Sequence, residues 1–404
     1  MTITDKFLEY VKINTQSDSR SNTVPSTKCQ LDLSNLLKKQ LDDLGLITKI
    51  DKGYVYGHLI SNIDKDVDTI GLIAHMDTAP DYSGLNVKPR IIKNWDGKDI
   101  KLNEDKTISL DMFPHMKSFI NDDIIVTDGN TLLGADDKAG ISIIMEVIEY
   151  LVNNKDIKHG DIKVCFTPDE EIGKGADCFD IEYFNADYAY TLDGSACNEL
   201  CYETFNAYEV IVNIKGVSIH PGSAKGKLIN AISLANKFDN MLPTFDRPEY
   251  TEKAEGFNHL HFINGSAENC KLEYIVRNHS KEIIMKQIDD FNRIKEYINN
   301  DLGYDAIDIE TNMQYQNMYE LLHDKNHILD LAKNAIKDIG LDLEIESARG
   351  GTDGSRLTFM GLPTPNLGTG GTNFHGPYEA CSINQMETMV KVVLKMIESI
   401  IKGN

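Results

Sequence analysis

One nearly all-apolar stretch constrains the fold of this chain more than any other feature. The segment TIGLIAHM, residues 69–76, is almost without polar side chains before its histidine. A strand that faces water on one side alternates apolar and polar residues, whereas a strand covered on both faces is apolar throughout. Further strand patterns at 161–168 and 186–194 alternate with amphipathic segments such as 138–152. This order predicts an α/β domain with a mostly parallel sheet flanked by helices.

The pattern changes near residue 206 and returns near residue 315. Between these points, half-buried strand patterns occur together with two long segments that have one apolar helical face. A chain of 404 residues is also larger than one ordinary core. We therefore expect a discontinuous first domain, residues 1–205 and 315–404, interrupted by an inserted α+β domain, residues 206–314, made of a sheet and two helices. The segments that support the insert are AYEVIVNIKG, HLHFING, KLINAISLANKFDNM and SKEIIMKQIDDFNRIKEYINN.

Charge and cysteine content restrict the partners and the compartment. The chain has 63 acidic against 41 basic residues, a formal net charge of -22. Such a surface repels phosphate backbones and anionic membranes, so no nucleic-acid or membrane partner is expected. No uncharged apolar run approaches the roughly 20 residues that span a bilayer, and MTITDKFLEYVKI lacks the features of a signal peptide. Seven cysteines without a CxxC pair indicate free thiols, which predicts a cytoplasmic protein.

Histidines and acids gather where the predicted strands end. In an α/β sheet, sites form beyond the carboxyl ends of the strands, so distant segments can converge there. Histidine with carboxylates is a ligand set that suits zinc, cobalt or manganese. Because residues two apart on a strand point the same way, Asp77 can accept a hydrogen bond from the ring nitrogen of His75 that binds no metal. The segments are AHMD (His75, Asp77), GADDKAG (Asp136, Asp137), TPDEE (Asp169, Glu170, Glu171), TLDG (Asp193) and FHG (His375).

Each of these segments alone is also compatible with an exposed polar loop. Adjacent Glu170 and Glu171 repel each other unless a positive group holds them or each has its own role. One could bind a metal ion while the other takes a proton from water. Other kinds of site are excluded because the sequence lacks residues that they require. The acids that begin at residue 64 would need glycine and glutamate where Thr69 and His75 stand to form an EF-hand. GSAKGKL departs from a phosphate-binding loop, with Leu228 in place of Ser or Thr, and the chain has no GxSxG motif.

Seven motifs, spread over nearly the whole chain, carry a family resemblance. They are VPST from Val24, TLLGADDKAG from Thr131, HGDIKVCFTPDEEIGKGA from His159, HPGSAKG from His220, RGGTDG from Arg349, FMGLPTPNL from Phe359 and GGTNFHG from Gly370. Together they resemble the peptidase T group of a large family of two-metal peptidases. That family also holds carboxypeptidase G, the succinyl-diaminopimelate desuccinylases and the aminoacylases. The resemblance implies a catalytic domain interrupted by a lid or dimerisation domain of sheet and two helices.

The resemblance also implies an activity and a role for each site residue. It implies an aminopeptidase that releases the N-terminal residue from tripeptides with two divalent metal ions, by default zinc, with cobalt or manganese as alternatives. The metals would lower the pKa of a shared water. The implied roles are these: His75 and Asp193 bind one metal, Glu171 and His375 the other, Asp136 bridges both, Asp77 orients His75, and Glu170 is the general base.

The substrate contacts and the assembly are less constrained. The family places a lid histidine near the oxyanion, which implies His220, and either Arg277 or Arg349 could hold the peptide carboxylate by paired hydrogen bonds. The glycine-rich stretch that the family has after TLDG is replaced by residues 195–197. Monomer and homodimer both remain open. The alternatives are a related two-metal dipeptidase, carboxypeptidase or deacylase and, in another class, a non-catalytic metal-binding protein.

Overall fold

The computed structural model describes residues 1–402, which form two compact units. The first unit comprises Met1–Tyr202, Leu321–Glu346 and Thr352–Asn404, and the second comprises Glu203–Glu320 and Ser347–Gly351. The segment expected as an insert, residues 206–314, lies inside the second unit. The short return at Ser347–Gly351 was not anticipated, because it is held by tertiary contacts, such as the Ala348 amide donating to the Glu203 carbonyl.

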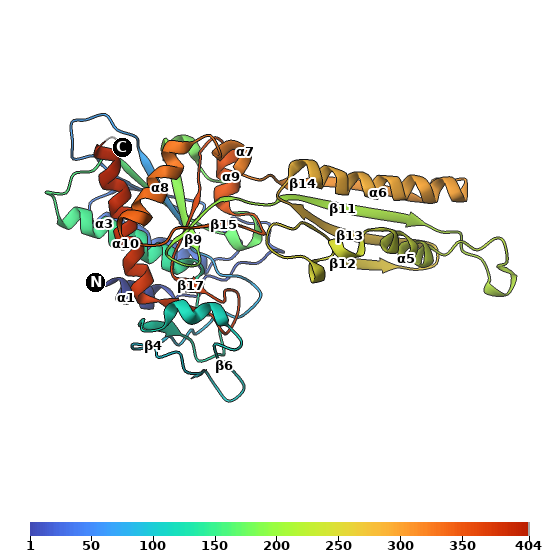
Figure 1. Cartoon of the computed structure of the whole chain (residues 1–404), viewed down its shortest axis with the longest axis horizontal. Coiled ribbons are helices and arrows are strands. Elements are labelled where there is room, and N and C mark those ends of the chain that lie inside the picture. Colours follow the sequence, from blue (N-terminus) through green and yellow to red (C-terminus); the bar gives the residue numbers. More distant parts are fainter. Residues whose placement is uncertain (403–404) are drawn as a thin grey trace. The chain divides into compact units, whose positions relative to one another are not determined.

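The first unit is built on one large sheet, with strand order β1-β2-β8-β3-β9-β16-β10-β15. Strands β9 and β15 of this sheet are labelled in Figure 1. Its four central strands β8, β3, β9 and β16 are mutually parallel, while β1, β2 and β10 pair antiparallel. The α/β fold class is therefore confirmed, with the parallel pairing confined to the centre. The strands are β1 Ile47–Asp51, β2 Tyr54–Leu59, β3 Ile70–His75, β8 Ile162–Thr167, β9 Tyr188–Gly194, β10 Glu199–Glu203, β15 Glu344–Ser347 and β16 Asn366–Gly368.

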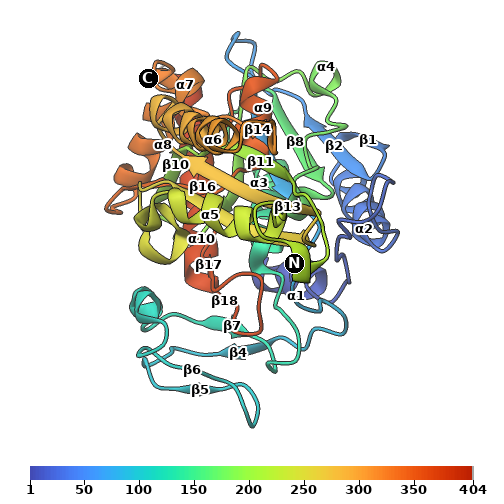
Figure 2. The same cartoon turned by 90° about the vertical axis from the view of Figure 1, so that its right-hand side faces the viewer.

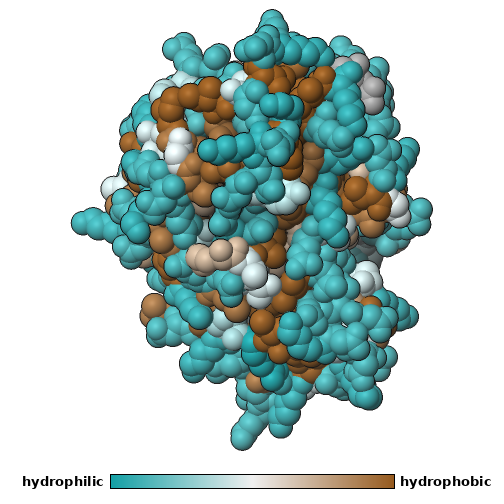
Figure 3. Space-filling view, turned by 90° about the vertical axis from the view of Figure 1, so that its left-hand side faces the viewer, coloured by the Kyte–Doolittle hydropathy of each residue, from teal (hydrophilic) through white to brown (hydrophobic). Residues whose placement is uncertain are grey.

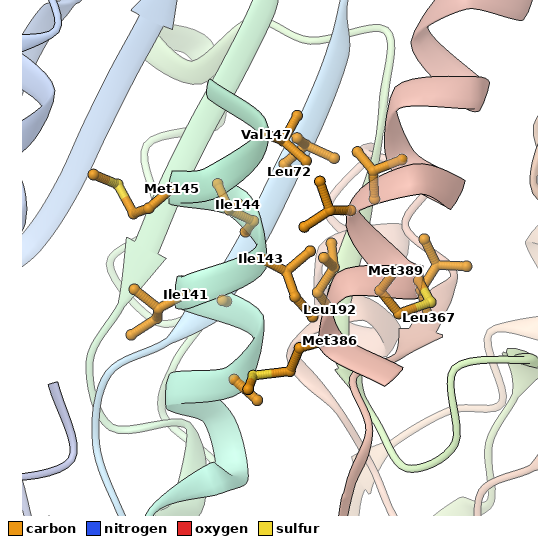
Figure 4. Packing of buried hydrophobic residues seen from close by; sticks show 14 of the residues in the cluster. Leu72, Ile141, Ile143, Ile144, Met145, Val147, Leu192, Leu367, Met386 and Met389 are labelled. Carbon is orange, nitrogen blue, oxygen red and sulfur yellow. The ribbon is translucent and has the colours of Figure 1, made fainter. Parts of the chain in front are cut away.

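Helices cover the central strands, which explains the apolar run along β3. All six residues of β3 are buried, and α3 and α10 pack together over the sheet. Figure 4 shows side chains of α3, such as Ile143 and Val147, meeting Leu72 of β3, Leu192 of β9 and Met386 of α10. The helices of this unit are α1 Ile3–Tyr10, α2 Gln30–Asp43, α3 Ala135–Asn153, α4 Ile181–Phe184, α8 Asn326–Asp338, α9 Asp353–Phe359 and α10 Ile383–Lys402. The short helix α7, Tyr319–Leu322, begins in the second unit and ends in the first.

A smaller sheet, absent from the sequence-based expectations, also belongs to the first unit. Strands β17, β18, β7 and β4 form it in that order, beside the two-stranded sheet of β5 and β6 (Figure 2). Trp95 lies at its core among residues such as Ile108 and Phe119. The loop between β17 and β18 carries His375, so this sheet positions one end of the site. Its strands are β4 Arg90–Ile92, β5 Ile100–Lys101, β6 Thr107–Ile108, β7 Ile124–Val126, β17 Gly371–Thr372 and β18 Ala380–Ser382.

The second unit is an antiparallel sheet with two helices. Its strand order is β12-β13-β11-β14, and α6 runs along the strands (Figure 1). Alternate residues of the central strands, such as Val212 and Leu272, are buried in a core with Phe238 and Phe291 of the helices. This is the sheet-and-two-helices composition predicted for the insert. The elements are β11 Asn206–Lys215, α5 Ala231–Met241, β12 Phe257–Gly265, β13 Asn269–Asn278, α6 Lys281–Leu302 and β14 Ile307–Tyr315.

The surface mixes charged and apolar side chains. Figure 3 shows one face of the molecule, on which apolar patches are separated by hydrophilic residues. A shallow groove between the ends of α3, α8 and α10 is lined by Ile157, Ile339 and Leu394 and bordered by lysines such as Lys391. Among residues 1–402, no helix has both the length and the apolar character needed to cross a membrane.

Candidate metal centre

Three parallel strands bring predicted ligands to one edge of the large sheet. β3 ends at His75, and β9 carries Asp193 beside its final residue. β8 ends at Thr167, three residues before Glu170 and Glu171. Because His75 and Thr167 are direct partners in the parallel register, these segments leave the sheet side by side. The convergence expected at the carboxyl ends of the strands is therefore present.

Asp136 lies between two imidazoles, near the start of α3. Its Oδ1 is 2.8 Å from Nε2 of His75, and its Oδ2 is 3.1 Å from Nε2 of His375. The same nitrogen of His75 lies 3.4 Å from Oδ1 of Asp193, and that of His375 lies 2.9 Å from Oε2 of Glu171. The structure thus brings together all five residues expected to bind metal. One carboxylate facing two imidazoles through different oxygens can serve as a bridge.

Two overlapping groups of side chains could each hold a metal ion. His75 with Asp137 and Asp193 forms one, and His75 with Asp136 and Glu171 forms the other. In each group the potential ligand atoms lie within 4.8 Å of one another. Asp137 is an addition to the expected ligand set.

The Asp77 carboxylate binds backbone N–H groups and also faces the His75 ring. Nδ1 of His75 is 3.0 Å from the Asp77 carbonyl oxygen and 3.4 Å from its Oδ1. The Asp77 carboxylate accepts hydrogen bonds from the backbone N–H groups of Glu170, at 2.9 Å, and Glu171, at 3.2 Å. A fully buried carboxylate thereby fixes the TPDEE loop relative to the end of β3.

Asp137 and Gly140 allow α3 to approach the sheet closely. The Asp137 carboxylate accepts the N–H groups of His75 and Gly140, each at 3.1 Å. A Cβ on Gly140 would lie 2.0 Å from the Leu192 carbonyl oxygen, far inside van der Waals contact. A residue without a side chain is therefore required where the first turns of α3 meet β9.

Asp169 anchors the start of the same acidic loop. Its backbone has φ of 62°, in the left-handed region that residues other than glycine seldom adopt. Its fully buried carboxylate accepts hydrogen bonds from the Ser26 backbone N–H and hydroxyl and from the Gln30 side-chain amide. VPST and TPDEE, far apart in sequence, meet through this contact.

Burial and mutual charge shift the pKa values of the site groups. Burial raises the pKa of Glu170 well above its usual value, that of Glu171 to about 7 and that of Asp193 to about 6. Burial has the same effect on Asp136, but hydrogen bonds with the two histidines outweigh it and lower the pKa. Hydrogen bonds to Asp136 and Glu171 raise the pKa of His375 to about 11. Carboxylates so crowded favour positive charge in their midst.

Three further buried ionisable groups surround the site and were not assigned a role from sequence. Asp353 accepts a hydrogen bond from the Thr167 hydroxyl at 2.9 Å, and burial raises its pKa to about 7. The Lys138 ammonium donates to the Ile13 carbonyl at 2.8 Å, and burial lowers its pKa to about 8. Glu379 accepts backbone N–H groups of the loop before α3. Asp353 and Lys138 lie within the motifs RGGTDG and GADDKAG, whereas nothing in the sequence distinguishes Glu379 from the other acidic residues.

Arg277, expected to bind substrate, belongs to the second unit. Its guanidinium donates to the carbonyls of Tyr208 and Val276 and to the side-chain oxygen of Gln314, and it lies 5.3 Å from the centroid of the Tyr315 ring. All of these partners are neutral. Within residues 1–402, no acidic side chain forms an ion pair with Arg277.

Arg349 and His220 also belong to the second unit. Arg349 donates to the backbone carbonyls of Lys253 and Glu255, and its guanidinium lies over the rings of Phe205 and Phe257. These contacts tie the loop at 251–255 to the 347–351 segment. His220 begins a short turn, in which its Nδ1 accepts the Gly222 N–H at 3.1 Å.

Comparison with known proteins identifies similar sequences and similar folds. Residues 126–399 match the model of peptidase family M20/M25/M40. Peptidase T of Clostridium perfringens is 51% identical over 396 residues, which cover 98% of each chain. The crystal structure of aminopeptidase PepT from Bacillus cereus has a TM-score of 0.79 at 25% identity, covering 99% of this chain and 98% of that one. A tripeptidase from Staphylococcus aureus gives a TM-score of 0.78 at 24% identity, with the same coverage.

The family model covers more than half of the chain, and a relative that is half identical covers nearly all of it. The resemblance found in the motifs is thereby confirmed. The chain belongs to peptidase family M20/M25/M40 and, within it, to the peptidase T group.

Proposed function

We propose that this protein is a metal-dependent aminopeptidase that releases the N-terminal residue from tripeptides. The observation that carries the proposal is the Asp136 carboxylate set between His75 and His375, with Asp193 and Glu171 completing the two pairs. Relatives named peptidase T and a solved tripeptidase support the substrate class.

The residues fit a pair of divalent metal ions. Two imidazoles and three carboxylates form a donor set suited to zinc, with cobalt and manganese as alternatives. In the described part of the chain, Oε1 of Glu171 is buried without a hydrogen-bond partner, so a cation would satisfy it. His75 and Asp193 would hold one ion, Glu171 and His375 the other, and Asp136 both. When bound, such ions acidify water and polarise the peptide carbonyl.

Glu170 would act as the general base. Of the two adjacent glutamates, Glu171 is the one that contacts His375, which leaves Glu170 for the role of base. Its backbone is held by Asp77, and the charges of Asp193 and His75 act on the pKa of its buried carboxyl. It would take the proton of the attacking water and deliver it to the leaving amine.

Arg277 is our candidate for the tripeptide carboxylate. In a chain with 63 acidic residues, its neutral partners leave its charge without an acidic counterpart in the described structure. A guanidinium can hold a carboxylate by two parallel hydrogen bonds, which would measure substrate length. In the Arg277→Ala variant, discrimination between a tripeptide and its C-terminal amide should shrink; an unchanged ratio would rule this residue out.

The first experiment compares Glu170→Gln with Glu182→Gln, which removes the same charge from exposed α4. Metal content and tripeptide hydrolysis are measured on both variants and on the wild type. We expect about two ions per chain throughout, with kcat lowered by roughly 10²–10⁴-fold only in Glu170→Gln, the usual contribution of a general base. Normal turnover in Glu170→Gln would refute its role.

A peptide panel separates the alternatives within the family. Tripeptides with a free amine should be cleaved, and N-acetylated tripeptides should not. Cleavage of blocked peptides or of dipeptides alone would instead favour a deacylase, carboxypeptidase or dipeptidase. Metal binding without hydrolysis of any peptide would favour a non-catalytic protein. Within residues 1–402, buried cysteines such as Cys165 and Cys381 are free thiols, which fits our proposal that the enzyme works in the reducing cytoplasm.

A further inference from the structure

The buried side chain of Glu379 connects the two loops that carry Asp136 and His375. It lies at the end of the loop between β17 and β18, four residues after His375. Its side chain is 1% exposed and reaches the loop that leads into α3. No role for this residue follows from the motifs or from the proposed ligand set.

The contacts of Glu379 are all to backbone N–H groups. Its Oε2 accepts from Leu133 at 2.7 Å and from Gly134 at 2.8 Å, and its Oε1 accepts from Asp136 at 3.0 Å. These three bonds occupy both carboxylate oxygens. They fix the peptide plane from which the Asp136 side chain projects.

The start of α3 explains why a remote carboxylate is needed. The first N–H groups of any helix lack intrahelical acceptors, and a side chain at the cap position normally supplies one. Asp136 and Asp137 at the start of α3 have non-helical backbone angles, and Asp137 caps the regular turns that follow by accepting the Gly140 N–H. The N–H groups of Leu133, Gly134 and Asp136 lie before this cap, and Glu379 supplies their acceptors.

We infer that Glu379 is a positioning residue that sets the Asp136 carboxylate against His375 for metal binding. The inference rests on the proposed function for its consequence but not for the contact itself. Because Glu379 and His375 share one loop, the three hydrogen bonds hold the two ligand loops together, and Nε2 of His375 lies 3.1 Å from Oδ2 of Asp136. Partners behind metal ligands commonly change affinity by about 10–100-fold when replaced.

Two substitutions test the inference. Glu379→Gln keeps the size, but one end of its amide becomes an NH₂ group that faces a backbone N–H, so at least one of the three bonds is lost in either orientation. Glu379→Asp keeps the charge but is one methylene shorter, and it provides a second variant should the first fail to fold. The control is Asp161→Asn. Asp161 directly precedes β8, at the end of that strand remote from the metal centre, and its carboxylate accepts the Ser61 N–H.

The first readout is hydrogen exchange of the 133–136 amides in metal-free full-length protein, and the second is zinc affinity by chelator competition. We expect faster exchange and about 10–100-fold weaker zinc binding in Glu379→Gln, with Asp161→Asn unchanged in both. Activity at saturating zinc should recover in part. Faster exchange with wild-type zinc affinity would show that Glu379 supports the loop without positioning the metal ligands, which would overturn the inference. Unchanged exchange would overturn the contact itself. Wild-type protein without bound zinc would refute the proposed function, while exchange would still decide whether Glu379 holds the loop.

Discussion

Substitution of Gly140 by alanine sets two effects of opposite sign against each other. Gly140 lies in the first turns of α3, where alanine is favoured over glycine by about 1 kcal/mol on helix propensity alone. The new Cβ, however, would lie 2.0 Å from the Leu192 carbonyl oxygen and 2.5 Å from Oδ1 of Asp137. Carbon–oxygen contacts normally begin near 3.3 Å, so α3 or β9 must shift by roughly 1 Å.

Such a shift is costly because both elements lie in the main core. Overpacking a well-packed interior costs roughly 1–3 kcal/mol and sometimes more, and here the obstacle is backbone rather than a flexible side chain. We expect a steric cost near the upper end of this range, about 3 kcal/mol, which exceeds the propensity gain of about 1 kcal/mol and leaves a net loss of about 2 kcal/mol. At roughly 2–4 °C per kcal/mol for domains of 150–250 residues, the midpoint of thermal unfolding should fall by several degrees.

Thermal unfolding followed by circular dichroism measures this effect. Gly350→Ala is the control, because a Cβ there meets nothing within 4 Å and the backbone is not left-handed. It should be neutral or slightly stabilising. An unfolding midpoint of Gly140→Ala at or above that of the wild type would refute the packing argument. Displacement of Asp137 should also loosen the His75 backbone, which it holds at 3.1 Å.

Three further predictions concern the metals and pH. Asp136→Asn should lose more bound metal than His375→Ala, by elemental analysis, because only Asp136 faces both imidazoles. Chelation should lower the unfolding midpoint measurably, since a ligand at 100 times its Kd stabilises by about 2.7 kcal/mol. Burial raises the pKa of Glu149, but the hydrogen bond and the charge of the Lys6 ammonium outweigh burial and lower the pKa. The stability that this ion pair contributes is present above the unfolded-state pKa of Glu149 and is lost as the pH falls through its lower folded-state pKa. Lys6→Met should therefore flatten the curve of stability against pH below about pH 5, and an unaltered curve would contradict this.

Support around the site was largely invisible in the sequence. Asp169 and Glu379 each hold a backbone segment from another part of the chain, Asp169 through Ser26 and Glu379 through Leu133. In a chain rich in acids, neither differs locally from a solvated carboxylate. Only burial and the partner N–H groups distinguish them, and both depend on the tertiary fold. Asp77 was expected to face the His75 ring, but its carboxylate also binds the TPDEE backbone.

The sequence by itself determined the α/β class and the placement of candidate ligands such as His75 and Asp193 at strand ends. Its apolar run along β3 requires cover on both faces, and parallel strands must end at one edge of the sheet. Tertiary structure alone decided which oxygen of Asp136 meets which imidazole, and that a glycine must stand where α3 touches β9. Periodicity reports the local environment of each residue, whereas these contacts join segments more than 50 residues apart, such as His75 and Asp136.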